Sequence, residues 1–402
     1  MADETPLVSV VTPVYKSEDI LARAVGGLLA QDLREWEALF IDDGSPESCW
    51  RVVQAYSWID PRIRTRRQAH AGACVARNRG IAESRGKYLV FLDADDWMEP
   101  DALRTMAAAC ETNGWAAAYG RLRYVTPEGN PTQWQGGFTQ GVDLFEAISG
   151  SNVLSVPSSV IVRRDVFDQI GAFDPTLVHC GDWDLWARLA RLDAPIGFVD
   201  QIITNYRMRP GSLSRSPRTL LRDAITTLRR IHLPDTRVSR PRPECAEGAD
   251  RNRLLSRICH FTVYAAALAI CNGGMKAAEP VLDVVNEWAG LSAQRAGEFV
   301  FYALCFAHCC GPEGVAGFWT DVVEPLHQLL PELERRTATP GLAGQMFDAM
   351  ETCCDISLAS LPLPLPSPEP LAPKRVARNV MLSSGDTLAH SALRLLAAQE
   401  GA

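Results

Sequence analysis

The sequence predicts an α/β domain built on a mostly parallel sheet, followed by an all-α region. Over the first 125 residues, short apolar runs rich in β-branched residues alternate with segments of helical periodicity. Apolar strands separated by helices are typical of a parallel sheet that is covered on both faces. From about residue 216 the strand signals fade, and Gly or Pro divides a series of helical segments. The length of 402 residues also favours more than one domain.

Each element of the predicted sheet follows from a local pattern. We expect strands at residues 7–11, 38–41, 63–67 and 88–92, and later at 160–162 and 198–206, because these runs are apolar and bounded by turn residues. Helical periodicity predicts helices over 20–28, 73–84 and 185–192. In the C-terminal half, helices are expected at 251–271, 278–289, 293–310, 315–336 and 342–355.

Composition and charge divide the chain further. We predict a domain over 1–215, with a nucleotide-binding part over about 1–125 and an acceptor part over 126–215, a basic connector at 216–250 and a helical domain at 251–358. Residues 359–402 are expected to form a Pro-rich linker and a last helix. Residues 216–243 carry seven basic and two acidic side chains. They could touch an anionic membrane surface or an acidic acceptor, or form a solvated face between domains.

The overall balance of the chain excludes some function classes. A net charge of −8 argues against nucleic acid as the main partner, and 47% hydrophobic residues argue against wholesale disorder. No secretory signal is visible, so a cytoplasmic location is expected, with possible peripheral contact at the inner membrane face. The uncharged stretch Ile258–Met275 is interpreted as a core helix. A zinc site from Cys305, His308, Cys309 and Cys310 is a minor alternative, because their spacing fits no usual zinc pattern.

Polar and acidic residues follow three of the predicted strands. These residues are Thr12–Tyr15, Asp42–Asp43 and Asp93–Asp95. In parallel sheets ligands bind at the carboxyl ends of the strands, so these groups should converge on one edge. A carboxylate there can hold a hard divalent cation, which in turn can bridge a diphosphate. A solvated acidic turn is the alternative interpretation of Asp93-Ala94-Asp95.

The N-terminal half resembles family 2 glycosyltransferases of the GT-A fold, which is Rossmann-like. Five motifs occur in the order and at the intervals of that family, and together they span about residues 5–215. They are Val8–Tyr15, Asp42–Ser45, Ala76–Gly80, Gly86–Asp96 and Asp182–Trp186.

The resemblance implies roles for single residues on the nucleotide side. Thr12, Pro13 and Tyr15 would line the nucleoside pocket, and Asp42 would accept a hydrogen bond from the base. On the diphosphate side it implies three more positions. Arg77 would approach the base or diphosphate, Asp93 and its neighbour Ala94 would contact the ribose or sugar, and Asp95 would hold Mn²⁺ or Mg²⁺.

On the acceptor side, the resemblance makes Asp182 the general base. A carboxylate there would take the proton of the attacking hydroxyl. A helix N-cap is the alternative role of this residue. Trp97 and Trp183 are candidates to contact the sugar or the acceptor. Two positions depart from the family pattern: Gly181 stands where Glu is usual, and Arg209 stands where His is frequent, which makes Arg209 a candidate clamp for the diphosphate.

The function expected from these residues is metal-dependent, inverting transfer from a nucleotide diphosphate sugar. A UDP-sugar is the expected donor, a bacterial source would be ordinary, and the acceptor could be a glycan, a lipid-linked or small molecule, or a peptide. The helical domain could bind the acceptor or build a homodimer. The alternative function is a non-catalytic nucleotide-binding scaffold that acts through the helical domain, which Gly181 and Arg209 would favour.

Overall fold

The structure is a computed structural model, and it describes residues 5–137, 143–210 and 216–353. By contacts the chain divides into two units, Met1–Ser367 and Pro368–Ala402, and every described residue belongs to the first. The predicted Pro-rich linker and last helix at 359–402 lie outside the described residues, as does the segment 211–215 that follows Arg209.

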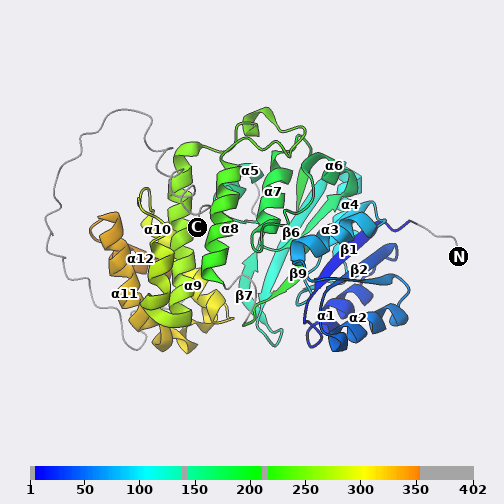
Figure 1. The fold of residues 1–402 in the computed structure, drawn as a ribbon, viewed down its shortest axis with the longest axis horizontal. Coiled ribbons are helices and arrows are strands. Elements are labelled where there is room, and N and C mark those ends of the chain that lie inside the picture. The colour runs from blue at the N-terminus through cyan, green and yellow to red at the C-terminus, as the bar shows by residue number, and fades with distance from the viewer. Residues whose placement is uncertain (1–4, 138–142, 211–215, 354–402) are drawn as a thin grey trace. The chain divides into compact units, whose positions relative to one another are not determined.

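A mixed sheet of nine strands forms the N-terminal half of the described chain (Figure 1). Its strands are β1 (Val8–Val14), β2 (Trp36–Asp43), β3 (Ile63–Gln68), β4 (Tyr88–Phe91), β5 (Trp97–Met98), β6 (Ala117–Val125), β7 (Pro131–Gly136), β8 (Val160–Arg163) and β9 (Ile196–Arg207). The order is β3-β2-β1-β4-β8-β6-β9-β5, with β7 paired to β6. Strands β3, β2, β1 and β4 run parallel, whereas β8 pairs antiparallel with β4.

Helices cover both faces of this sheet, as the apolar strands predict. They are α1 (Leu21–Leu29), α2 (Glu47–Ile59), α3 (Ala73–Glu83), α4 (Ala102–Asn113), α5 (Leu144–Ile148), α6 (Phe167–Ile170) and α7 (Gly181–Arg191). Alternate residues of β1 enter different cores: Val8 and Val10 pack with α1, α2 and α4, whereas Val11 packs with α3 and α7. Burial on both faces explains why these strands read as continuous apolar runs.

The C-terminal half of the described chain is helical, as predicted. Its helices are α8 (Pro217–Ile231), α9 (Leu254–Leu282), α10 (Ala293–Ala307), α11 (Trp319–Thr337) and α12 (Leu342–Glu351). Helix α9 contains a kink at Gly273 and Gly274, and Gly274 has a φ of 61°, which favours glycine. The predicted break between two helices at 271–278 is therefore a kink within α9. This helix ends at Leu282, whereas the sequence predicts a helix up to residue 289.

Helix α8 connects the two halves physically. Its residues Ala224, Leu228 and Ile231 belong to the core that covers one face of the sheet. Leu220 and Leu221 of the same helix belong to the core of the helical region. In Figure 1 α8 lies between α7 and α9, and both helices contact it. The predicted boundary between a basic connector and a helical domain stays a prediction, but the two halves share hydrophobic packing.

One described helix, Arg251–Leu282, is long and apolar enough to cross a membrane by length and composition alone. Within its most apolar window, 61% is buried inside the protein. Val263, Leu268 and Ile270 pack in the core of the helical region, and the kink at Gly273 and Gly274 interrupts the straight helix. These contacts favour the interpretation of this segment as a core helix.

Candidate active site

The carboxyl ends of β1, β2 and β4 lie next to one another, as predicted. Val14, the last residue of β1, is paired with Asp42 on β2, and Val11 is paired with Phe91, the last residue of β4. The sheet therefore brings the Thr12–Tyr15 segment, Asp42 and the acidic turn after β4 to one edge. Helix α3, which carries Arg77, packs against β1 and β2.

Asp42 is a buried carboxylate at this edge that accepts no hydrogen bond from the described residues. Its residue is 0% exposed, and both oxygens are buried. Arg67 Nε lies 3.2 Å from Oδ2, which is close enough for an ion pair but not aligned for a hydrogen bond. Thr12 Oγ1 is buried and unpartnered as well. Buried polar groups usually have partners, so these atoms mark a place where a ligand can supply an N–H or O–H donor.

Around Asp42, other predicted residues take different places. Tyr15 is 41% exposed and stacks on His70, with ring centroids 4.2 Å apart. Pro13 lies beside Thr12 on β1 and is partly buried. Asp43 is structural: its carboxylate accepts hydrogen bonds from the backbone N–H groups of Ala71 and Gly72 at 2.9 and 2.8 Å. Asp43 thereby fixes the loop that leads into α3.

The acidic turn after β4 is held by two arginines. Arg77 Nη2 donates to Asp93 Oδ1 at 2.5 Å, and Arg209 Nε donates to Asp95 Oδ2 at 2.5 Å. Ala94, between the two carboxylates, is buried. Asp96 accepts a hydrogen bond from the backbone N–H of Arg207, while its Oδ2 is unpartnered.

Burial raises the pKa of Asp95, and the attraction of Arg209 opposes this shift. For Asp96, burial together with the charges of Asp95 and Asp93 raises the pKa well above its usual range. Although burial alone would lower the pKa of Arg77, the charge of Asp93 raises it. The turn thus gathers three carboxylates, and Arg77, Arg209 and Arg207 each act on one of them.

A hard divalent cation fits the donor chemistry of this turn, because carboxylate oxygens are its preferred ligands. Within residues 5–137, 143–210 and 216–353, no three His, Cys, Asp or Glu side chains are grouped to hold a metal ion. Asp95 would therefore need further oxygens, such as those of a diphosphate, to complete a coordination shell. The alternative zinc site at Cys305, His308, Cys309 and Cys310 is likewise not formed among these described residues.

The predicted base, Asp182, lies in the first turn of α7. Its Oδ2 accepts a hydrogen bond from Asn152 Nδ2 at 2.8 Å. Burial raises the pKa of Asp182, Arg77 and Asn152 oppose that rise, and Asp93 adds to it. Asp182 is therefore close enough to the Arg77–Asp93 pair to interact with it electrostatically. A carboxylate with a raised pKa is a better proton acceptor near neutral pH.

Sequence reasoning missed two residues that make contacts at or near the predicted base. Asn152 lies in an irregular segment 30 residues earlier and carries no motif. Asp223 on α8 is buried, and its Oδ2 accepts from the backbone N–H groups of Val178 and His179 at 2.9 and 2.8 Å. This pair of bonds fixes the loop before α7. The sequence signal that could have drawn attention to Asp223 is its position as an acidic residue within the otherwise basic α8.

Gly181, the first departure from the family pattern, has a steric explanation. A Cβ at this position would lie 2.5 Å from the Sγ of Cys74. The Cys74 thiol is buried and donates to the carbonyl oxygen of Leu177 at 3.3 Å. A glutamate at position 181 would therefore collide with Cys74.

We expect Gly181→Ala to destabilise the protein by about 1–3 kcal/mol, the usual cost of overpacking a close contact. Cys74→Ala should relieve the collision, so the double variant should recover most of the loss in a thermodynamic cycle measured by urea unfolding. Gly344→Ala on α12, where an added Cβ meets nothing within 4 Å, is the matched control. Equal costs at positions 181 and 344 would contradict the steric explanation.

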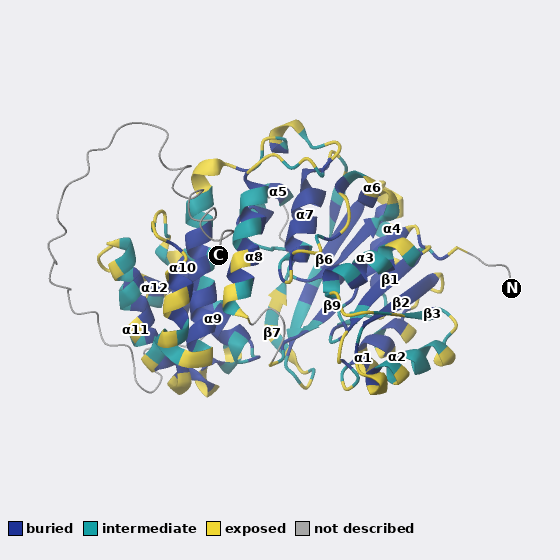
Figure 2. Cartoon of the chain, viewed as in Figure 1, coloured by how far each residue is buried: buried dark blue, intermediate teal, exposed yellow. Residues whose placement is uncertain are grey.

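The two tryptophan predictions have different outcomes. The prediction for Trp183 was wrong: the residue is 1% exposed, and its Nε1 donates to the carbonyl oxygen of Ile148 at 2.9 Å. Both faces of α7 are covered, so this side chain packs in the core and cannot reach an acceptor. Figure 2 shows α7 in the dark blue of buried residues. Trp97 is partly exposed on β5, between the guanidinium groups of Arg23 and Arg207. Its contact with a sugar stays a prediction.

The basic connector is tied into the protein rather than forming a fully solvated face. Asp184 on α7, expected to serve the first helical turn, is buried and accepts from Arg188, Arg230 and Arg237. Arg242 pairs with Asp143 at 2.9 Å. Much of the positive charge of this stretch is therefore used internally, which weakens the idea that it binds a membrane surface.

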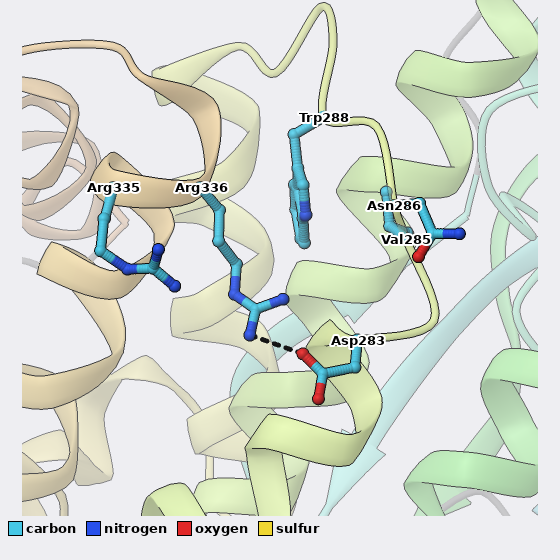
Figure 3. Close-up of a pocket in the computed structure, with 6 residues that line it drawn as sticks. All are labelled: Asp283, Val285, Asn286, Trp288, Arg335 and Arg336. Atoms are coloured by element: carbon cyan, nitrogen blue, oxygen red, sulfur yellow. Dashed lines mark hydrogen bonds and ion pairs between the residues drawn. The ribbon is translucent and has the colours of Figure 1, made fainter. Parts of the chain in front are cut away.

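A pocket of about 470 Å³ lies in the helical region (Figure 3). Its lining residues are Asp283, Val285, Asn286, Trp288, Arg335 and Arg336. Arg336 pairs with Asp283 at 2.7 Å, and Arg335 pairs with Glu332. Asp283 is the one carboxylate among these lining residues, so the pocket offers no acidic cluster comparable to the turn after β4.

Comparison with known proteins is consistent with this site. Residues 9–171 match the model of the family "Glycosyl transferase family 2". The chain contains a family 2 glycosyltransferase domain. The match covers β1 to β8 and includes Asp42, Arg77 and the acidic turn. It confirms the resemblance, the α/β fold and the transferase class that the sequence predicts.

Two relatives are glycosyltransferases of Bacillus subtilis. Uncharacterized glycosyltransferase EpsJ is 26% identical over 223 residues, which is 53% of this chain and 64% of EpsJ. Putative teichuronic acid biosynthesis glycosyltransferase TuaG is 26% identical over 215 residues, which is 53% of this chain and 84% of TuaG. The solved structure of S. aureus TarS is 14% identical, covers 86% of this chain and 54% of TarS, and has a TM-score of 0.48.

Proposed function

We propose that the protein transfers a sugar from a UDP-sugar to a hydroxyl of a saccharide acceptor, with inversion at the anomeric carbon. The observation that carries the proposal is the presence of two carboxylates of different kind, one at the edge of the sheet that carries the acidic turn and one close enough to interact with the Arg77–Asp93 pair. Asp42 is buried without a hydrogen-bond donor, and Asp182 is a carboxylate with a raised pKa at the start of α7. The first suits binding of a nucleobase, and the second suits removal of a proton.

The nucleotide end of the proposal rests on Asp42 and its neighbours. A buried carboxylate acceptor needs an N–H donor, and the imide N–H of uracil supplies one. The exposed ring of Tyr15 offers an aromatic surface next to that place. Guanine also presents N–H donors, so a comparison of UDP with GDP tests this part of the proposal.

At the reacting end, Asp182 would take the proton of the attacking hydroxyl. Arg77 and Arg209 are placed to bind the diphosphate, because each guanidinium already lies at the acidic turn and can form paired hydrogen bonds to phosphate oxygens. Asp95 would hold Mn²⁺ or Mg²⁺, which supplies positive charge that stabilises the leaving diphosphate.

The name of TuaG, a putative teichuronic acid biosynthesis glycosyltransferase, supports a saccharide acceptor. We place the reaction in a bacterial cytoplasm, where sugar nucleotides are made. The family match makes a purely non-catalytic scaffold the weaker alternative.

The test is a thermal-shift and turnover screen with UDP, GDP, UDP-glucose and UDP-N-acetylglucosamine, each with and without Mn²⁺. We expect UDP with Mn²⁺ to raise the melting temperature by roughly 5 °C at saturation, because a ligand that binds only the folded state stabilises it. We also expect slow release of UDP from at least one of the two sugars. EDTA should abolish that release.

Asp42→Ala should lose the UDP-dependent shift, whereas Asp168→Ala, which changes an exposed carboxylate on α6, should keep it. Stabilisation by GDP but not by UDP would overturn the assignment of uracil as the nucleobase that Asp42 binds. Binding without any turnover would favour the scaffold instead.

A further inference from the structure

Asn152 contacts the carboxylate of the proposed base directly. Its Nδ2 donates to Asp182 Oδ2 at 2.8 Å. The orientation of the amide follows from charge, because only the NH₂ group can donate to a carboxylate. The other amide atom, Oδ1, is therefore turned away from Asp182, where it is buried and accepts no hydrogen bond from the described residues. A buried acceptor without a partner calls for an explanation, and this one belongs to the residue that bonds to the proposed base.

The segment that carries Asn152 is fixed from two directions. Ahead of it, the carbonyl oxygen of Ile148 accepts from Trp183 Nε1 at 2.9 Å, which ties the segment to the same helix as the base. The carbonyl oxygen of Gly150 accepts from Arg295 on α10 at 3.1 Å. Behind it, the backbone N–H of Ser155 donates to the Asn152 carbonyl at 3.1 Å. Helix α10 of the helical region thus helps to hold Asn152 in place.

We propose that Asn152 is a positioning residue for the transfer reaction, which orients the carboxylate of Asp182 and stabilises its ionised form. The proposal rests on the proposed function of Asp182 as the base. The bond from Asn152 to Oδ2 fixes the orientation of the carboxylate that would meet the attacking hydroxyl. The helical region then contributes to the reaction through Arg295 and the fixed loop, besides any contact with an acceptor.

The electrostatic surroundings of Asp182 make this contact measurable. Burial raises its pKa, Asp93 raises it further, and Arg77 and Asn152 lower it. The two thiols near it, Cys74 and Cys180, have pKa values raised by burial, the first to about 11, so both stay neutral near pH 7. Removal of the Asn152 donor leaves Arg77 as the main group that favours the ionised base. The pKa of Asp182 should then rise.

The test compares Asn152→Ala, which removes the amide, and Asn152→Asp, which keeps the shape but replaces the donor by a second carboxylate. For hydrolysis of UDP-glucose or UDP-N-acetylglucosamine with Mn²⁺, the acid limb of kcat/KM should move upward by about one pH unit in Asn152→Ala. The shift should be larger in Asn152→Asp, because a like charge is added. At pH 7 kcat should fall while the donor KM stays close to that of the unchanged protein.

A second measurement does not depend on turnover. Carbon-13 NMR of protein labelled at the aspartate carboxyl carbons, with the Asp182 signal identified by its loss in Asp182→Asn, should show the same rise of the Asp182 pKa in Asn152→Ala. Asn113→Ala is the control, because Asn113 is an exposed asparagine at the end of α4 that bonds only to the carbonyl oxygen of Ala109.

The two measurements separate the two proposals. Absence of hydrolysis in the unchanged protein, with the NMR shift present, would overturn the proposed reaction and support the contact between Asn152 and Asp182. An Asp182 pKa that is the same in Asn152→Ala, Asn113→Ala and the unchanged protein would overturn the role of Asn152.

Discussion

Asp182→Asn should leave UDP binding unchanged and reduce sugar transfer by about 10²–10⁴-fold, the usual contribution of a positioned general base. Asparagine has the shape of aspartate but takes no proton at neutral pH. Its amide can still bond to Asn152, so α7 and the loop before it should stay in place. The loss should therefore appear in kcat, with the UDP-dependent thermal shift preserved.

Asp193→Asn is the matched control, because Asp193 is an exposed aspartate just after the same helix. It should keep full activity and full stability. Transfer by Asp182→Asn at the rate of this control would show that another group takes the proton. An equal loss of UDP binding and of transfer would indicate that Asp182 supports the fold of the site instead.

Asp184→Ala should have the largest effect on stability. Asp184 accepts hydrogen bonds from Arg188 at 2.9 Å, Arg237 at 2.9 Å and Arg230 at 3.1 Å. The side chain of Arg188 is 1% exposed, and burial lowers its pKa. Removal of the carboxylate would leave a buried guanidinium without its counter-charge. Breaking a buried ion pair from one side costs about 3–5 kcal/mol.

The measurement is equilibrium unfolding in urea, with Asp165→Ala as the control. Asp165 pairs with Arg163 in a bridge whose aspartate side chain is 57% exposed, so its loss should cost about 0–1 kcal/mol. The loss of stability in Asp184→Asn should lie between the losses in these two variants, because asparagine keeps the shape of aspartate but not its charge. Similar costs for positions 184 and 165 would contradict the view that the cluster around Asp184 fastens α7 to α8.

The sheet and its functional edge were predictable because their signals are local. Runs of four to eight mostly apolar residues form strands that are buried on both faces, and the residue after such a strand lies at its carboxyl end. Parallel pairing then brings the ends together, so Asp42 and the acidic turn after β4 could be placed at one edge before the structure was known. The role of Asp182 as the base is what the resemblance of its motif to the family implies, and it stays a prediction.

Residues that act through distant contacts were not predictable. Asn152 reaches Asp182 across 30 residues, and Arg230 and Arg237 reach Asp184 across 46 and 53. No periodicity connects such positions. Helical spacing also left the role of Trp183 open. In the structure α5, α6 and α8 pack against α7, and Phe261 of α9 contacts Trp183, so this side chain is buried.

By itself, the sequence determined the α/β class, the helical C-terminal half and the set of candidate carboxylates, because each depends on residue type and near-neighbour pattern. The tertiary structure alone decided which of these carboxylates are free to act. Asp42 is left without a hydrogen-bond donor among the described residues, Asp95 is held by Arg209, Asp184 is used by the fold, and Asp182 is held by Asn152. The difference among these carboxylates depends on which cation or hydrogen-bond donor lies within about 3 Å of each oxygen. Folding sets that distance through long-range packing.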